Sequence, residues 1–291
     1  MKKLTWILAL VLMLAGCSSK ETTAEPIQIL VPQGAPALAL LPLYEGENIS
    51  IDSVAGSDPL TAELAKAASD YDVIVAPINL GAKMIEKQSS DYRLASIVTW
   101  GNLYIVGSEE YQSGDPLAAF GENAVPQKIL TERGFGENVT YFGSAQDVQA
   151  QLLSDRFTAG LLAEPAATAT IAKAKEKGMS FAILHDLQKN DEGQTGYPQA
   201  AIFIKSGREA ACEEALMQVE AFLNESRDEA EMKTMMEKVG LENLGIPSAE
   251  VALATWERQN LHYVAAEDAR DEITAFLKLF DITFDSDMLI R

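Results

Sequence analysis

The sequence predicts a two-lobed α/β protein with a C-terminal helical block. From residue 26 onward, short apolar runs alternate with longer amphipathic runs, which is the pattern of strands followed by helices. The same alternation is repeated in a second stretch that starts near residue 126, and only helix-period segments follow residue 207. The chain has 291 residues, and this length also favours about two domains.

The first half is expected to contain three strands with helices between them, and then two further strands. The predicted strands are 27–31, 49–54, 71–76, 93–98 and 103–107. The third is apolar enough to be buried on both faces. One helix is predicted from Ala37. A second is predicted after Asp58-Pro59, with Asp58 as the N-cap, and a third after Pro77.

The second half is expected to repeat this order. The predicted strands are 139–142, 159–163, 181–184 and 200–205, and residues 188–199 form a long polar loop. Predicted helices occupy 126–133, the segment opened by the Ser144-x-x-Asp147 capping box, and the Ala-rich run after Glu164-Pro165. The C-terminal helices are predicted near 208–224, 227–239, 248–258 and 267–280.

Composition excludes several functions. The net charge of −20 argues against nucleic-acid binding, which needs a basic surface. Two Cys and two His are too few for a zinc site unless distant residues converge, and no D-x-D-x-D-G calcium loop is present. We expect no metal and no cofactor; a cation bound by carboxylates, such as calcium, is the alternative. The hydrophobic fraction of 47% is enough for a sizeable core.

The N-terminus predicts secretion. Lys2 and Lys3 precede an unbroken apolar run, 6–15, which is too short to span a bilayer permanently. The run ends in Leu-Ala-Gly before Cys17, which resembles the lipobox of bacterial lipoproteins. This resemblance implies a signal peptide over 1–16, lipidation of Cys17, and a location on the outer face of the cell membrane. Residues 17–25 would be a polar tether. The alternative is an ordinary signal peptide with an incidental cysteine.

The two halves imply two lobes between which the chain crosses near 100–106 and 197–203. We assign 26–101 and 203–291 to lobe one and 102–202 to lobe two. Ligands of such folds bind at the carboxyl ends of strands and between domains, so the loops that follow strands are the candidate site.

This order of elements resembles the substrate-binding lipoproteins of ABC importers, in the two-lobed (type 2) periplasmic-binding-protein-like group for nitrate, sulfonates, taurine and thiamine-precursor pyrimidines. The resemblance covers nearly the whole mature chain, although each motif alone is weakly specific. It rests on segments 34–36, 72–77, 100–103, 160–165 and 202–204. It implies a monomeric receptor whose lobes close over a small-molecule ligand and which then docks on the transmembrane subunits of a permease.

On this resemblance, thirteen residues are expected to contact the ligand. They are Gly34, Ala35, Pro36, Ser57, Asp58, Pro77, Asn79 and Trp100 on lobe one, Gly121, Asn123, Ser144 and Glu164 on lobe two, and Tyr197 at the second crossing. Asp58, Ser144 and Glu164 are equally well explained as helix-start residues. Trp100 is either a stacking face or core, and 121–123 is either a contact or a surface turn.

The candidate loops contain no Lys, Arg or His but carry Asp58, Glu122 and Glu164. Anion receptors commonly use Arg, so a neutral or weakly basic solute is favoured, for example a thiamine-precursor pyrimidine. A receptor for sulfonate- or taurine-type anions is the alternative.

Two other classes remain. The group that the sequence resembles includes a pyrimidine-synthase branch, but neither His185 nor His262 lies in a candidate loop, and the chain has no G-x-S-x-G or Walker A motif. We therefore expect no catalysis. A surface interaction lipoprotein on the same fold would show no ligand-induced closure. Cys212 is expected to be a packed, inert thiol.

Overall fold

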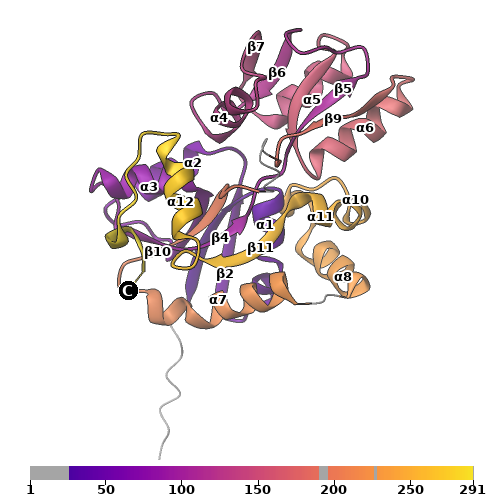
Figure 1. The fold of residues 1–291 in the computed structure, drawn as a ribbon. Coiled ribbons are helices and arrows are strands. Elements are labelled where there is room, and N and C mark those ends of the chain that lie inside the picture. The colour runs from indigo at the N-terminus through magenta and orange to yellow at the C-terminus, as the bar shows by residue number, and fades with distance from the viewer. Residues whose placement is uncertain (1–25, 190–195, 226–227, 291) are drawn as a thin grey trace, which may run out of the picture.

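The computed structural model describes residues 26–189, 196–225 and 228–290, so the predicted signal peptide, Cys17 and the tether lie outside the described residues. Figure 1 shows two lobes, each built on its own sheet, with the chain passing between them near the centre of the molecule. Within the described ranges, no helix is both long enough and apolar enough to cross a membrane.

Lobe one is built on a six-stranded mixed sheet in the order β11-β4-β10-β3-β1-β2. Its strands are β1 (Ile27–Pro32), β2 (Ile49–Val54), β3 (Val73–Pro77), β4 (Tyr92–Thr99), β10 (Ala200–Lys205) and β11 (Leu261–Ala265). Strands β1 to β4 run in one direction, and β10 and β11 run in the opposite direction. The predicted boundary between residues 202 and 203 falls inside β10, because the whole of β10 belongs to this sheet.

Helices cover both faces of this sheet, and most of them come from the C-terminal block. They are α1 (Ala35–Ala39), η1 (Leu41–Glu45), α2 (Asp58–Leu64), α3 (Ile78–Glu86), α7 (Glu209–Asn224), α8 (Glu229–Val239), α9 (Leu241–Leu244), α10 (Ala249–Ala254), α11 (Trp256–Gln259), α12 (Arg270–Lys278) and η2 (Ser286–Met288). Side chains of α2, α3 and α12 bury one face, whereas α1, α7, α8 and α10 bury the other.

Lobe two is a five-stranded sheet in the order β7-β6-β8-β5-β9. Its strands are β5 (Leu103–Ser108), β6 (Leu117–Phe120), β7 (Val139–Phe142), β8 (Ala159–Ala163) and β9 (Phe181–Asp186), and its helices are α4 (Val125–Glu132), α5 (Ala145–Leu153) and α6 (Ala166–Glu176). Only β5 runs against its neighbours. In Figure 1 this lobe lies above lobe one.

One apolar cluster runs through both lobes. Successive residues of a strand point to opposite faces, so in β5 Leu103 and Ile105 face one side of the sheet and Tyr104 faces the other. Leu103 and Ile105 belong to the same cluster as Ile74 and Phe203 of lobe one. The packed core is therefore continuous across the crossings.

Several sequence predictions were wrong. The C-terminal block contains β11, which pairs antiparallel with β4, although only helices were expected there. Strand β6 was missed, and the predicted helix over 248–258 is broken at Thr255. Ser57 is the residue at the N-cap of α2, so Asp58 is its first helical residue rather than its cap.

Cys212 lies on α7 with no exposed surface, which confirms the predicted packing of this thiol. Burial raises the pKa of Cys212 to about 11, so the nucleophilic thiolate is scarce at neutral pH. Met232 and Met236 of α8 are likewise buried and pack in the core of lobe one.

Candidate functional site

The two sheets turn the carboxyl ends of most of their strands toward each other. Residues 100–102 lead from the end of β4 directly into Leu103 of β5, which lies opposite Ala163 at the end of β8. The return crossing enters β10 at Ala200, which lies beside both Pro77 and Thr99. The loops after β1, β3 and β4 therefore lie on one facing edge, and the loops after β6, β7 and β8 lie on the other.

At the two crossings, the side-chain amides of buried Asn102 and half-buried Gln199 link the two chain segments. Asn102 is almost fully buried, and its Oδ1 accepts a hydrogen bond from Gln199 Nε2 at 2.9 Å on the other crossing. The Asn102 backbone N–H donates to Gln199 Oε1 at 3.2 Å, and Asn102 Nδ2 donates to the carbonyl of Glu164 at 3.3 Å. One side chain thus connects both crossings with the end of β8.

On lobe one, the residues of the first predicted loop, 34–36, take part in backbone hydrogen bonding and packing within the lobe. Gly34 has φ of 94°, which favours glycine, and its N–H donates to the carbonyl of Leu244 at 2.8 Å. Ala35 is buried and Pro36 is half-buried. Ser57 and Asp58 are exposed at the start of α2, and the Ser57 side chain makes no capping bond.

Pro77 and Asn79 lie where β3 passes into α3. Pro77 is the N-cap residue of α3, and Asn79 lies in its first turn. The Oδ1 atom of Asn79 is buried and has no hydrogen-bond partner within the described residues. An unsatisfied buried acceptor costs free energy, so Asn79 remains a candidate to bind a polar group.

Trp100 and Tyr197 flank the crossings and are mostly buried. Trp100 is 8% exposed and stacks on His262, with ring centroids 5.1 Å apart and planes 11° apart. Tyr197 is 6% exposed and stacks on Phe276 at 5.5 Å. Both aromatic rings therefore already have partners inside the protein. Trp100 Nε1 and the Tyr197 hydroxyl are buried without a hydrogen-bond partner among the described residues, so these two rings offer polar atoms in addition to apolar faces.

Burial governs the pKa of the titratable groups around these rings. It lowers the pKa of His262, so this imidazole is neutral at pH 7. Burial also raises the pKa of Tyr197, against a smaller lowering by the charge of Arg133 on lobe two. Neither group acts as an ion between the lobes near neutral pH.

On lobe two, three predicted residues have local structural roles. Gly121 has φ of 73°, and an added Cβ would lie 2.6 Å from Pro126, so this position needs glycine. Asn123 is exposed, and its N–H donates to Gln127 Oε1 at 2.6 Å. Ser144 caps α5 by accepting from the N–H of Asp147 at 3.2 Å, as the capping box predicts.

Glu164 is the predicted residue with the most connections. Its side chain has no exposed surface, and it follows β8 immediately before a cis bond to Pro165. The carboxylate accepts from Thr168 Oγ1 at 2.7 Å, from the Thr168 N–H at 3.0 Å, and from Arg258 Nε at 2.9 Å. Both carboxylate oxygens already accept hydrogen bonds from the protein. Glu164 therefore holds Thr168 and Arg258 in position.

Arg258 comes from α11 of lobe one and was not predicted. Its Nη2 donates to Thr168 Oγ1 at 2.9 Å, and its side chain is 43% exposed. The Arg258 carbonyl accepts from the Tyr104 hydroxyl and from Gln188 Nε2, each at 2.8 Å. Arg258 thus connects α11 with three other segments of the chain, which contain Tyr104, Glu164 with Thr168, and Gln188. No local signal in the sequence pairs it with Glu164, which is 94 residues away.

Two more cations reach this region from helix α4 and its C-cap. Arg133 Nε donates to the carbonyl of Leu187 at 3.3 Å, and Lys128 Nζ lies 5.9 Å from the ring centroid of Phe280, just after α12. The candidate loops themselves lack cations, but the tertiary structure places guanidinium groups beside them.

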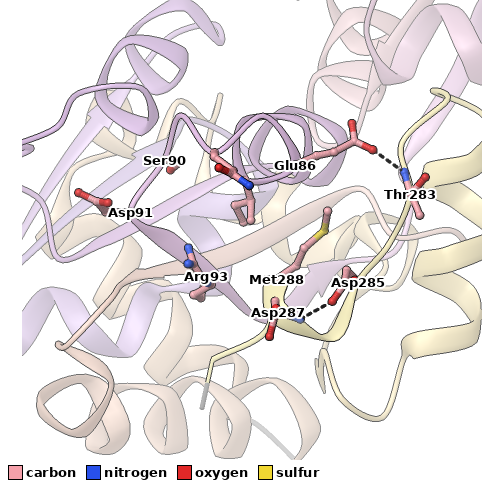
Figure 2. Close-up of a pocket in the computed structure, with 10 residues that line it drawn as sticks. Glu86, Ser90, Asp91, Arg93, Thr283, Asp285, Asp287 and Met288 are labelled. Carbon is pink, nitrogen blue, oxygen red and sulfur yellow. Dashed lines mark hydrogen bonds between the residues drawn. The ribbon is translucent and has the colours of Figure 1, made fainter.

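A hollow of about 610 Å³ lies away from the crossings, where α3 and the start of β4 meet the C-terminal segment (Figure 2). Three of its charged side chains make hydrogen bonds within the chain. Glu86 Oε1 accepts from the Thr283 N–H at 2.8 Å, Asp285 Oδ1 accepts from the Asp287 N–H at 2.8 Å, and Arg93 Nη1 donates to the Tyr92 carbonyl at 2.7 Å. We assign these residues to the packing of the C-terminal segment on lobe one. Across the described residues, no three Cys, His, Asp or Glu side chains are grouped to hold a metal ion.

No family model and no curated protein sequence matches this chain. Solved structures do match it over nearly its full length. An ABC transporter from Parabacteroides distasonis is 21% identical with a TM-score of 0.72, and the alignment covers 91% of this chain and 99% of that one. The zinc-bound ligand-binding component of an ABC-type import system from Staphylococcus aureus is 14% identical with a TM-score of 0.67, covering 92% and 96%. The periplasmic aliphatic sulphonate binding protein SsuA from Escherichia coli is 13% identical with a TM-score of 0.62, covering 91% and 88%.

The shared fold confirms the predicted fold class, a two-lobed periplasmic-binding-protein-like α/β structure. These three matched structures are substrate-binding or transport components by their descriptions. At these identities the similarity concerns the fold.

Proposed function

We propose, from the fold that it shares with solute-binding components of ABC importers, that this protein captures a small organic solute between its lobes and delivers it to a permease. One observation carries the proposal: the carboxyl ends of β3 and β4 face those of β6 and β8 across a pair of chain crossings. A ligand that touches both edges stabilises the closed arrangement and shifts the population toward it.

The proposed binding residues are those of the predicted set whose polar atoms lack partners or lie exposed on the facing edges. They are Asn79, Trp100 and Tyr197 near the crossings and Ser57, Asp58 and Asn123 farther out. Gly34, Ala35, Pro36, Pro77, Gly121 and Ser144 would shape the edges through their backbone and caps, and Glu164 would act through Arg258.

The proposed solute is neutral or weakly basic, for example an aminopyrimidine related to thiamine precursors. The exposed carboxylates of Asp58 and Glu122 lie on the candidate loops, whereas the guanidinium of Arg258 is paired with Glu164. A sulfonate-type anion is the second candidate, because one structural neighbour is a sulphonate-binding protein and two arginines lie near the crossings.

The expected result of adding the correct solute is a contraction of the whole protein. Purified protein without residues 1–25 would be titrated with 4-aminopyrimidine and with taurine by calorimetry. Small-angle scattering would be recorded before and after saturation. We expect heat and a smaller radius of gyration with the pyrimidine. Tight taurine binding with no response to the pyrimidine would replace our solute class with the anionic one.

We place the protein on the outer face of the cell membrane, held by lipid on Cys17. Several acyl chains on one residue give durable anchoring, at about 0.8 kcal/mol per buried methylene. A Cys17→Ala variant should move from the membrane fraction to the soluble fraction and lose acyl-chain mass. Cys212→Ala, which changes the other cysteine, should stay in the membrane fraction. A membrane-bound, unacylated Cys17→Ala protein would refute the anchor.

We propose no catalytic role and a monomeric receptor. His185 packs on Phe135 with ring centroids 4.5 Å apart, and His262 packs on Trp100, so both imidazoles lie in aromatic contacts. Recovery of a chemically altered solute after incubation would contradict this assignment. A surface interaction protein on the same fold would bind its partner without lobe contraction.

A further inference from the structure

Glu164 and Arg258 form an ion pair that joins the two lobes beside the first crossing. Glu164 directly follows β8 of lobe two, and Arg258 belongs to α11 of lobe one. The Nε–Oε1 distance is 2.9 Å, and the carboxylate is fully buried. Tyr104 and Gln188, which donate to the Arg258 carbonyl, hold the backbone of α11 at the same place.

The arginine side is only partly enclosed. Its side chain is 43% exposed, Nε and Nη2 are directed at Glu164 and Thr168, and Nη1 makes no hydrogen bond within the described residues. Without Glu164, this group would present a full positive charge and a free donor next to the facing edges. Guanidinium groups of this kind bind sulfonates and carboxylates, so the carboxylate determines whether Arg258 can attract an anion.

We propose that the Glu164–Arg258 pair sets the charge selectivity of the interlobe site. Glu164 cancels the charge that Arg258 brings between the lobes, so the site takes uncharged or weakly basic solutes and rejects sulfonate-type anions. This inference rests on the proposed solute-binding function. Arg258 is a specificity residue in it, and Glu164 is a positioning residue that acts through Arg258.

The test compares five proteins: wild type, Glu164→Gln, Arg258→Gln, the double variant, and Thr168→Val. Glu164→Gln removes the negative charge but keeps an amide oxygen that can accept from Thr168 N–H. Thr168→Val is the matched control, because it removes one hydrogen bond to each member of the pair and leaves both charges in place. Circular dichroism and thermal melting establish that each protein is folded.

The probes are ethanesulfonate and 4-aminopyrimidine, with affinities measured by calorimetry at low and high salt. We expect Glu164→Gln to bind ethanesulfonate at least about ten-fold more tightly than wild type, with a gain that shrinks as salt screens the charge. Arg258→Gln should bind ethanesulfonate more weakly than wild type. The double variant and Thr168→Val should keep the preference of the wild type, because neither changes the net charge of the pair.

Equal ethanesulfonate affinity in wild type and Glu164→Gln, with 4-aminopyrimidine still bound, would overturn the inference alone. The inference also fails if Thr168→Val changes the preference as strongly as Glu164→Gln, because the effect would then be structural. Failure of the proposed function has a different signature: no probe contracts any of the five proteins in small-angle scattering.

Discussion

The free energy of unfolding of an Arg258→Met variant should be about 2–3 kcal/mol lower than that of the wild type. Methionine keeps an apolar stem of similar length but removes the cation, which leaves the buried carboxylate of Glu164 uncompensated. The loss is smaller than for a fully buried pair, because Arg258 is partly exposed and Thr168 still donates two hydrogen bonds to Glu164. Urea unfolding followed by circular dichroism measures it.

The matched control is Lys238→Met, which removes the cation from an ion pair on the surface. Lys238 Nζ lies 2.7 Å from Glu45 Oε1, but the lysine side chain is 68% exposed. Exposed pairs are worth about 0–1 kcal/mol, so this variant should be close to wild type. Equal destabilisation of the two variants would mean that burial of Glu164 does not govern the effect.

Phe203→Ala should destabilise the protein by about 3–5 kcal/mol, the range for deleting a buried aromatic ring. Phe203 lies in β10, between β3 and β4 in the middle of the six-stranded sheet, and is completely buried. Its ring packs directly on α3, since a Cβ added to Gly81 of that helix would clash with the ring. Removing the ring leaves a void under this helix. Thermal and urea unfolding report the loss.

A second substitution tests whether this contact is the cause. Gly81→Ala alone should cost about 1–3 kcal/mol by overpacking against Phe203. In a Phe203→Leu background the added methyl group has more room, so the cost of Gly81→Ala should fall. Additive effects of the two substitutions would show that Gly81 and Phe203 do not compete for the same space.

Much of the fold could be predicted because short stretches of sequence indicate where strands and helices form. Strand β3 is an apolar run with both faces buried, and Ser144 caps α5 as its spacing indicates. Strand β6 escaped prediction because Ala118 and Ala119 have low strand propensity, whereas the equally short β7 consists of β-branched and aromatic residues. Strand β11 lies between helices in the sequence. Its position is decided by antiparallel pairing with β4, in which Leu261 lies opposite Thr99, a residue far from it in the chain.

The candidate site was predictable as a set of loops but not as a set of contacts. The loops after β3, β6 and β8 do lie on facing edges, because parallel strands bring their carboxyl ends together. Those loops lack cations, which favoured a neutral solute. A cation nevertheless lies beside them, since Arg258 reaches Glu164 from a helix in the C-terminal block.

The sequence by itself determined the α/β class, the two-lobed order of elements and the acidic character of the chain, whereas the export signal stays a prediction. These properties depend on composition and on short-range periodicity, which can be read from short windows of the chain. Only the tertiary structure decided that Trp100 and Tyr197 stack on His262 and Phe276, and that Glu164 is paired rather than free. Such contacts join residues far apart in the chain, and they form because a buried ring or charge must find a partner wherever the fold places one.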